Sequence, residues 1–170
     1  EPASSGGLNS FGKPVEYRDA GRKGLCAPFG LASALHAIGA ADNQGDDLGA
    51  RFKARATRLA KADDPVKACV DVMNEAGWPV EKTYKARGAF DTLQNVSYHP
   101  TLVQLTERHC VATIEDDDGK WIYDSNEARA LPLTIESLQR CMGEGRTYEG
   151  AAVRAYRFAP GKRARKAQKR

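Results

Sequence analysis

The sequence predicts an α+β fold in which helices come first and an antiparallel sheet follows. Apolar residues recur at helical spacing as far as Gly77, and short apolar runs separated by polar turns begin after Trp78. At 170 residues the chain is long enough to form one domain that buries a core without disulfides. The sequence shows no internal repeat, so a repeat architecture is not expected.

Three helices are expected before Gly77. The first begins near Pro28, a residue that suits the first turn of a helix, and ends at Gly39. The second covers residues 49–62. The third extends from Asp64 to Gly77, and its apolar residues fall at i, i+3, i+4 and i+7, the spacing of one buried stripe: Val66, Cys69, Val70 and Met73.

Five short strands and one further helix are expected in the second half. The strands cover residues 80–86, 101–106, 109–115, 120–125 and 150–159, and the helix covers 133–142. The run "DDDG" at 116–119 predicts a four-residue turn in which Gly119 has a positive φ. With that loop, the pairs across the hairpin are Glu115 with Lys120, Val111 with Asp124, and His109 with Asn126.

Charge is distributed unevenly along the chain. The last ten residues hold six of the 26 Lys and Arg and none of the 22 acids, which leaves 20 basic residues against 22 acidic ones elsewhere. We expect residues 1–10 to be a flexible segment, 11–160 to be the folded domain and 161–170 to be a disordered basic tail. A globular nucleic-acid binder is expected to carry an excess of basic residues on a folded face, and the chain outside the tail has no such excess. Only the tail is therefore a candidate for contact with a nucleic acid or another polyanion. The start "EPASSGG" reads as linker, which suggests a piece of a longer protein.

The cysteines and the hydropathy indicate a cytoplasmic, reducing setting. Four cysteines are spread widely along the chain, unlike a disulfide framework. We expect Cys69, Cys110 and Cys141 to be reduced and mostly buried, and Cys110, which alternates with His109 along the strand, to face the side opposite the active site. No apolar run approaches the roughly 18 residues of a membrane span, so no membrane partner is expected.

Cys26 is the candidate nucleophile, because it precedes the first helix and the partial positive charge of a helix N-terminus favours the thiolate. A cysteine nucleophile also needs a base. His36 lies ten residues further along the same helix, about 15 Å away, and His99 precedes a proline in a loop. His109 begins a strand whose hairpin partner brings back an acid, Asp124, and an amide, Asn126; either can orient its ring.

Two segments resemble a known family. "GLCAPFGLASAL" is similar to the nucleophile helix of Josephin-type deubiquitinating peptidases, and "HCVATIEDDDGKWIYDS" resembles their His-strand, turn and Trp-strand. The resemblance covers about residues 20–158 and implies a papain-like thiol protease architecture, with a helical insertion ahead of the sheet. It implies that Cys26 is the nucleophile, His109 the general base and later acid, and Asp124 the orienter, where Josephin proteins usually carry Asn.

The resemblance also implies a function and leaves alternatives. It implies a cysteine peptidase that hydrolyses peptide or isopeptide bonds of a ubiquitin or ubiquitin-like protein. A protease that processes a junction in its own polyprotein, and a non-catalytic binding module with the same fold, remain open. The family places a Gln before the nucleophile as an oxyanion donor, whereas "EYRDAGRKG" has no Gln or Asn, so the backbone N–H of Cys26 is expected to serve with another donor.

No metal site or cofactor is expected. The sequence has no C-x-x-C pair, and the side chains of His109 and Cys110 point to opposite faces of a strand. The "DDDG" run lacks the glutamate that a calcium loop needs at its twelfth position.

Overall fold

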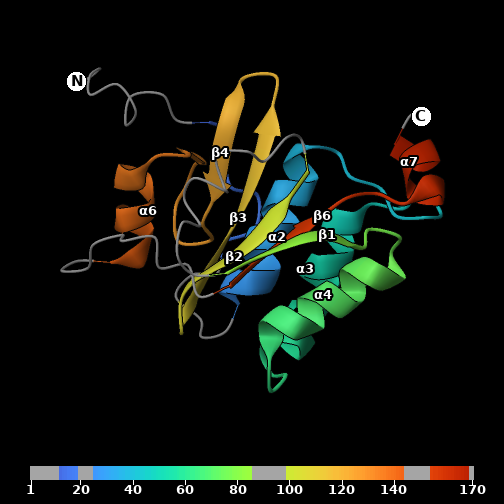
Figure 1. Cartoon of the computed structure of the whole chain (residues 1–170), viewed down its shortest axis with the longest axis horizontal. Helices are drawn as coiled ribbons and strands as arrows, with labels where there is room; N and C mark the ends of the chain where they lie inside the picture. Colours follow the sequence, from blue (N-terminus) through green and yellow to red (C-terminus); the bar gives the residue numbers. More distant parts are fainter. Residues whose placement is uncertain (1–11, 19–24, 86–98, 144–153, 169–170) are drawn as a thin grey trace.

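A six-stranded antiparallel sheet forms the centre of the protein (Figure 1). The computed structural model describes residues 12–18, 25–85, 99–143 and 154–168. The strand order is β1-β6-β2-β3-β4-β5. The strands are β1 (Val80–Lys85), β2 (Thr101–Thr106), β3 (His109–Asp116), β4 (Gly119–Tyr123), β5 (Leu131–Pro132) and β6 (Arg154–Phe158).

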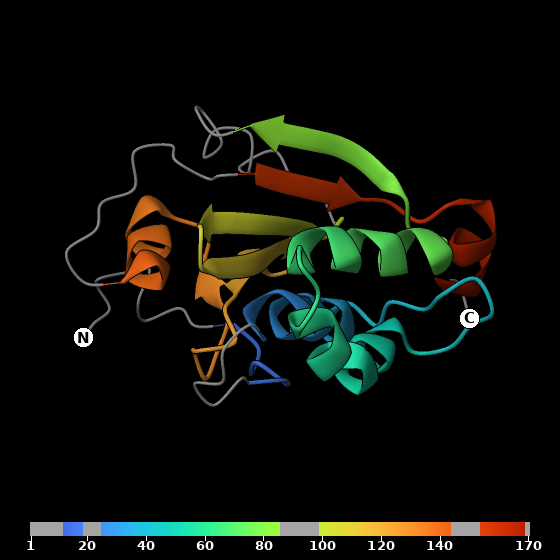
Figure 2. The same ribbon diagram turned by 90° about the horizontal axis from the view of Figure 1, so that it is seen from below.

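Three helices precede the sheet in sequence and pack on one side of it (Figure 2). They are α2 (Cys26–Ala37), α3 (Leu48–Ala60) and α4 (Pro65–Glu75). Asp47 and Asp64 cap α3 and α4 by accepting hydrogen bonds from backbone N–H groups of the first turn. The predicted α+β class is therefore confirmed, with the helix that begins at Cys26 and a helical insertion packed on a C-terminal antiparallel sheet.

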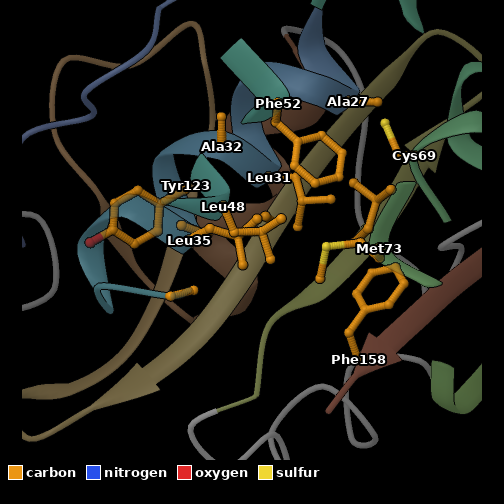
Figure 3. Packing of buried hydrophobic residues seen from close by; sticks show 14 of the residues in the cluster. Ala27, Leu31, Ala32, Leu35, Leu48, Phe52, Cys69, Met73, Tyr123 and Phe158 are labelled. Atoms are coloured by element: carbon orange, nitrogen blue, oxygen red, sulfur yellow. The ribbon is translucent and has the colours of Figure 1, made fainter. Parts of the chain in front are cut away.

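The main core lies between these helices and the sheet (Figure 3). It contains apolar side chains from α2, α3, α4 and the inner face of the strands, among them Leu31, Leu35, Phe52, Met73 and Phe158. A Cβ atom at Gly30 would lie 3.2 Å from the carbonyl oxygen of Tyr123 and 3.6 Å from the backbone N of Ala112. The absence of a side chain at Gly30 thus lets α2 lie directly on the backbone of β3 and β4.

The β3–β4 hairpin has the predicted register. Glu115 pairs with Lys120 and Ala112 with Tyr123, and Gly119 has a φ of 140°. The pairing continues to Asp116 and Gly119, so the turn itself has two residues rather than the predicted four. The Asp116 carboxylate shortens it by accepting hydrogen bonds from the backbone N–H groups of Asp118 and Gly119.

Helix α6 (Ile135–Met142) belongs to a second, smaller core on the other face of the sheet. This core contains alternate residues of β2, β3 and β4, namely Val103, Leu105, Val111 and Ile122, together with Leu138 and Cys141 of α6. The helix lies within the predicted span 133–142. The two-residue strand β5 was not predicted, because it is too short to show a periodic pattern.

The C-terminal segment departs from the expected disordered tail. Residues Lys162–Gln168 form α7, with Ala164 fully buried. The Gln168 side chain accepts a hydrogen bond from the backbone N–H of Ala41 and donates one to its carbonyl oxygen, each 2.6 Å long. The basic residues of α7 are exposed, whereas Ala164 and Gln168 contact the rest of the domain. The expected flexible residues 1–10 lie outside the described residues.

Candidate active site

Cys26 is the first residue of α2 and is partly exposed. Its pKa is lowered from 9.0 to about 5, chiefly by hydrogen bonding to the side chain of Cys110, with further contributions from His109 and from the backbone of Cys110 that outweigh the opposing effect of burial. The thiol also lies 3.8 Å from the carbonyl oxygen of Arg108. The local environment therefore favours the thiolate at neutral pH.

His109, the first residue of β3, reaches both the thiol and the acid. Its Nε2 atom lies 3.1 Å from Oδ2 of Asp124, and its ring also contacts the thiol of Cys26, which leaves Nδ1 for the sulfur. The contact with Asp124 is mainly electrostatic, because its alignment is poor for a hydrogen bond. Burial alone would lower the pKa of the imidazole, but the pairing with Asp124 and Cys26 raises it to about 10.

Asp124 follows β4 and is held rigidly. Its side chain is only 2% exposed, and Oδ1 accepts a 2.9 Å hydrogen bond from the backbone N–H of Asn126. Burial would raise the pKa of this carboxyl, but His109, the Asn126 backbone and the Cys141 thiol together lower it. Of the two predicted orienters, Asp124 is thus the one whose side chain pairs with the ring, while Asn126 is exposed.

The expectation that Cys110 faces away from the site is wrong. Cys110 does alternate with His109, and it belongs to the core on the α2 side with Ala112 and Ile114. Cys26 lies on that same side, because it begins α2, which packs on this face of the sheet. Cys110 therefore approaches Cys26 from the strand that α2 covers, and His109 reaches it from the end of that strand. The pairing of β3 with β2 is irregular at this point, between Gln104 and Thr106.

A cavity of about 440 Å³ opens beside the Cys26 sulfur. Asp64 and Arg154 form part of its wall as an ion pair. Two guanidinium nitrogens of Arg154 donate to the two carboxylate oxygens of Asp64 at 3.0 and 2.6 Å. The third, Nε, donates to Oε1 of Gln104 at 2.6 Å. The residues that line the cavity are Cys26, Ala27, Asp64, Pro65, Val66, Gln104, Glu107, Arg108, Cys110 and Arg154.

The other two histidines lie elsewhere, as expected. His36 is exposed and 3.6 Å from Glu16, and His99 lies 3.3 Å from Glu81. The segment in which the family Gln would lie falls mostly in residues 19–24, outside the described residues. At the start of α2 the backbone N–H groups of Cys26 and Ala27 have no acceptor within the helix, and Pro28 has no N–H. In the described ranges, no three His, Cys, Asp or Glu residues are placed to hold a metal ion.

Comparison with known proteins adds one likeness of fold. The crystal structure of the Pseudomonas avirulence protein AvrPphB is similar to this chain at 16% identity and a TM-score of 0.49, over 79% of this chain and 91% of that one. No protein-family model matches the chain. No curated protein matches it either. The resemblance to Josephin-type peptidases therefore rests on the two sequence segments, and the chemistry of the site rests on its geometry.

The arrangement brings the thiol of Cys26, the imidazole of His109 and the carboxyl group of Asp124 into successive contact beside a cavity. All four cysteines are unpaired, and Cys69, Cys110 and Cys141 are buried, as expected. Sequence reasoning missed the contact of Cys110 with Cys26, the thiol of Cys141 beside Asp124, and the Asp64–Arg154 wall. Asp64 was recognised only as the start of α4; nothing local in the sequence indicates its pairing with Arg154, 90 residues away.

Proposed function

We propose that this protein is a cysteine peptidase of the papain-like type, with Cys26 as nucleophile, His109 as general acid and base, and Asp124 as the residue that orients the imidazole. The observation that carries the proposal is the continuous contact from the Cys26 thiol through His109 to Asp124. Opposite shifts of the two pKa values, to about 5 and about 10, favour a thiolate–imidazolium pair across the neutral range.

The reaction proceeds in two stages. The Cys26 thiolate attacks the carbonyl carbon of the substrate, and the N–H groups of Cys26 and Ala27 stabilise the oxyanion. The imidazolium of His109 then gives its Nδ1 proton to the leaving nitrogen, the C–N bond breaks, and a thioester remains on Cys26. In the second stage neutral His109 takes a proton from water, the resulting hydroxide attacks the thioester, and the acid product leaves as the thiolate re-forms.

The substrate is a protein chain, with one side chain next to the scissile bond in the cavity beside Cys26. The Josephin resemblance supports the C-terminal tail of ubiquitin or a ubiquitin-like protein as the substrate. A junction in a polyprotein that contains this domain is the competing substrate, because papain-like folds serve both kinds of cleavage. Both reactions use the same three side chains, so they are separated by probes rather than by site geometry.

Electrophilic probes test the proposal. A ubiquitin that carries a C-terminal vinyl ester and a peptide vinyl sulfone should each be offered to the wild-type chain, to Cys26→Ala and to Cys69→Ala as a matched cysteine control. Labelling by either probe that Cys26→Ala abolishes and Cys69→Ala retains supports a peptidase. Labelling by the ubiquitin probe supports the first substrate, and self-cleavage of a longer precursor, followed by intact-mass measurement, supports the second. Non-covalent ubiquitin binding with no labelling and no cleavage contradicts the proposal and favours a binding module.

A further inference from the structure

We propose that Cys26 and Cys110 form a reversible disulfide that switches this site off in the presence of a peroxide. The inference concerns regulation and rests on the proposed function for its consequence, though the bond itself does not depend on peptidase activity. It assigns Cys110 the role of a resolving cysteine, that is, the thiol that captures the first oxidation product of Cys26.

The packing of α2 on β3 brings Cys26 and Cys110 to the same cavity. A Cβ atom added at Gly30 would lie 3.7 Å from Cα of Val111 and 3.6 Å from the backbone N of Ala112. One helical turn back from Gly30 is Cys26, and the residue before Val111 on the strand is Cys110. Both residues line the same cavity, and the neighbouring Cys110 side chain is the first cause of the lowered pKa of Cys26. Both thiols are free, so the bond can form without breaking another disulfide.

The two thiols differ in the way that a sensor pair requires. Cys26 is partly exposed and has a lowered pKa, so a peroxide reaches it as a thiolate, whereas Cys110 is 5% exposed and its pKa is raised. The first cause of that raised pKa is the neighbouring Cys26. Once Cys26 is a neutral sulfenic acid, its negative charge no longer raises the pKa of Cys110, so Cys110 becomes easier to deprotonate.

Each step balances. The Cys26 thiolate attacks one oxygen of hydrogen peroxide, the O–O bond breaks, hydroxide leaves, and sulfur loses two electrons as it becomes a sulfenic acid. The Cys110 sulfur then attacks the Cys26 sulfur, the S–O bond breaks, and the Cys110 proton leaves with the oxygen as water. The new S–S bond removes the nucleophile. A dithiol reductant restores both thiols by exchange through a mixed disulfide.

Peptide mapping tests the bond directly. The full chain, with its thiols reduced, is treated with excess hydrogen peroxide at neutral pH, blocked with an alkylating agent and digested with trypsin without reduction. Trypsin separates the four cysteines: Cys26 falls in residues 24–51, Cys69 in 68–82, Cys110 in 109–120 and Cys141 in 141–146. The expected product is residues 24–51 linked to 109–120, and dithiothreitol should release it.

Recovery provides the second readout. After peroxide and then dithiothreitol, wild type and Cys69→Ala should regain most of their own starting alkylation at Cys26. Cys110→Ala should regain little, because its sulfenic acid continues to the irreversible sulfinic acid. Sulfinic acid at Cys26 in wild type, or a link from Cys26 to Cys69, would overturn the proposal. Because these readouts need no substrate, a chain that forms the link but cleaves nothing refutes the peptidase alone, and an active chain without the link refutes the switch alone.

Discussion

The pairing of His109 with Asp124 gives a prediction whose size follows from the structure. Asp124→Asn keeps the side-chain volume and removes the charge 3.1 Å from Nε2 of His109. Coulomb's law at that distance, with an effective dielectric constant of about 20, gives about 5 kcal/mol of attraction between the two charges. An amide oxygen at this position can still accept a hydrogen bond from the Nε2–H and keeps part of this stabilisation, so we expect the pKa of His109 to fall by roughly 2–3 units.

The sign of the effect on the pH profile is definite. His109 has a raised pKa, so its imidazolium is present below about pH 10 in the wild type and is lost as the pH rises through that value. The Cys26 thiolate is present above about pH 5. The rate of peptide cleavage should therefore form a bell between these limits, whose limbs belong to the coupled pair. In Asp124→Asn the alkaline limb should move toward neutral pH, and the rate of peptide cleavage at pH 7 should fall roughly 10²- to 10⁴-fold.

The assay is the cleavage rate of a peptide substrate from pH 4 to 11, beside the rate of iodoacetamide alkylation of Cys26, which reports the thiolate alone. Asp118→Asn makes the same chemical change at an exposed position on the same hairpin and should leave both profiles in place. A urea denaturation curve shows whether Asp124→Asn is still folded. A folded Asp124→Asn with an unmoved alkaline limb and wild-type turnover would refute the assignment of Asp124, and a large loss in Asn126→Ala instead would transfer the role to the amide.

Three further predictions concern packing, specificity and the C-terminus. Gly30→Ala should lower the free energy of unfolding by about 1 kcal/mol in urea denaturation, because overpacking against the Tyr123 carbonyl exceeds the gain in helix propensity; greater stability would contradict the close approach of α2 to the sheet. Asp64→Asn keeps the cap of α4 but frees the charge of Arg154, so a fluorogenic peptide panel should shift toward acidic side chains; an unchanged ranking would mean that the cavity does not bind that side chain. Deletion of residues 162–170 should lower the free energy of unfolding by about 1–3 kcal/mol through loss of the Ala164 and Gln168 contacts, whereas deletion of 169–170 should not change it. Equal effects of the two deletions would contradict a stabilising role of α7.

The parts of the fold that could be predicted are those that local pattern determines. The stripe of α4 follows from the period of 3.6 residues, and the partners of β3 and β4 follow from the length of one turn. This register alone brings both Asp124 and Asn126 close to His109, but it does not decide which of them orients the ring. The contact of Cys110 with Cys26 could not be predicted in this way, because it depends on how closely α2 lies on β3, and that distance is determined by Gly30 and the strand backbone.

The C-terminal helix shows the complementary failure. Six charged residues in ten predict a solvated segment, and the charges of α7 are indeed exposed. The helix is ordered by a small number of uncharged contacts, namely the burial of Ala164 and the two hydrogen bonds between the Gln168 side chain and the backbone of Ala41. These join residues 127 positions apart, so composition could not reveal them.

The start of α2 departs from the rule that the neighbouring helices obey, and this departure supports the proposed chemistry. Helices α3, α4 and α6 each begin with a side chain that accepts a hydrogen bond from a first-turn N–H, whereas the residue before α2 is Leu25, which has no acceptor. Helices α3 and α4 also lack an acidic residue in the first turn, but each has an aspartate as its N-cap, whereas α2 has neither. A capping carboxylate there would satisfy the N–H groups, but it would also place a second negative charge beside the Cys26 thiolate and raise its pKa. An uncapped helix start instead keeps these donors for the thiolate and for an oxyanion that forms during reaction, a local loss of stability of the kind expected at a functional site.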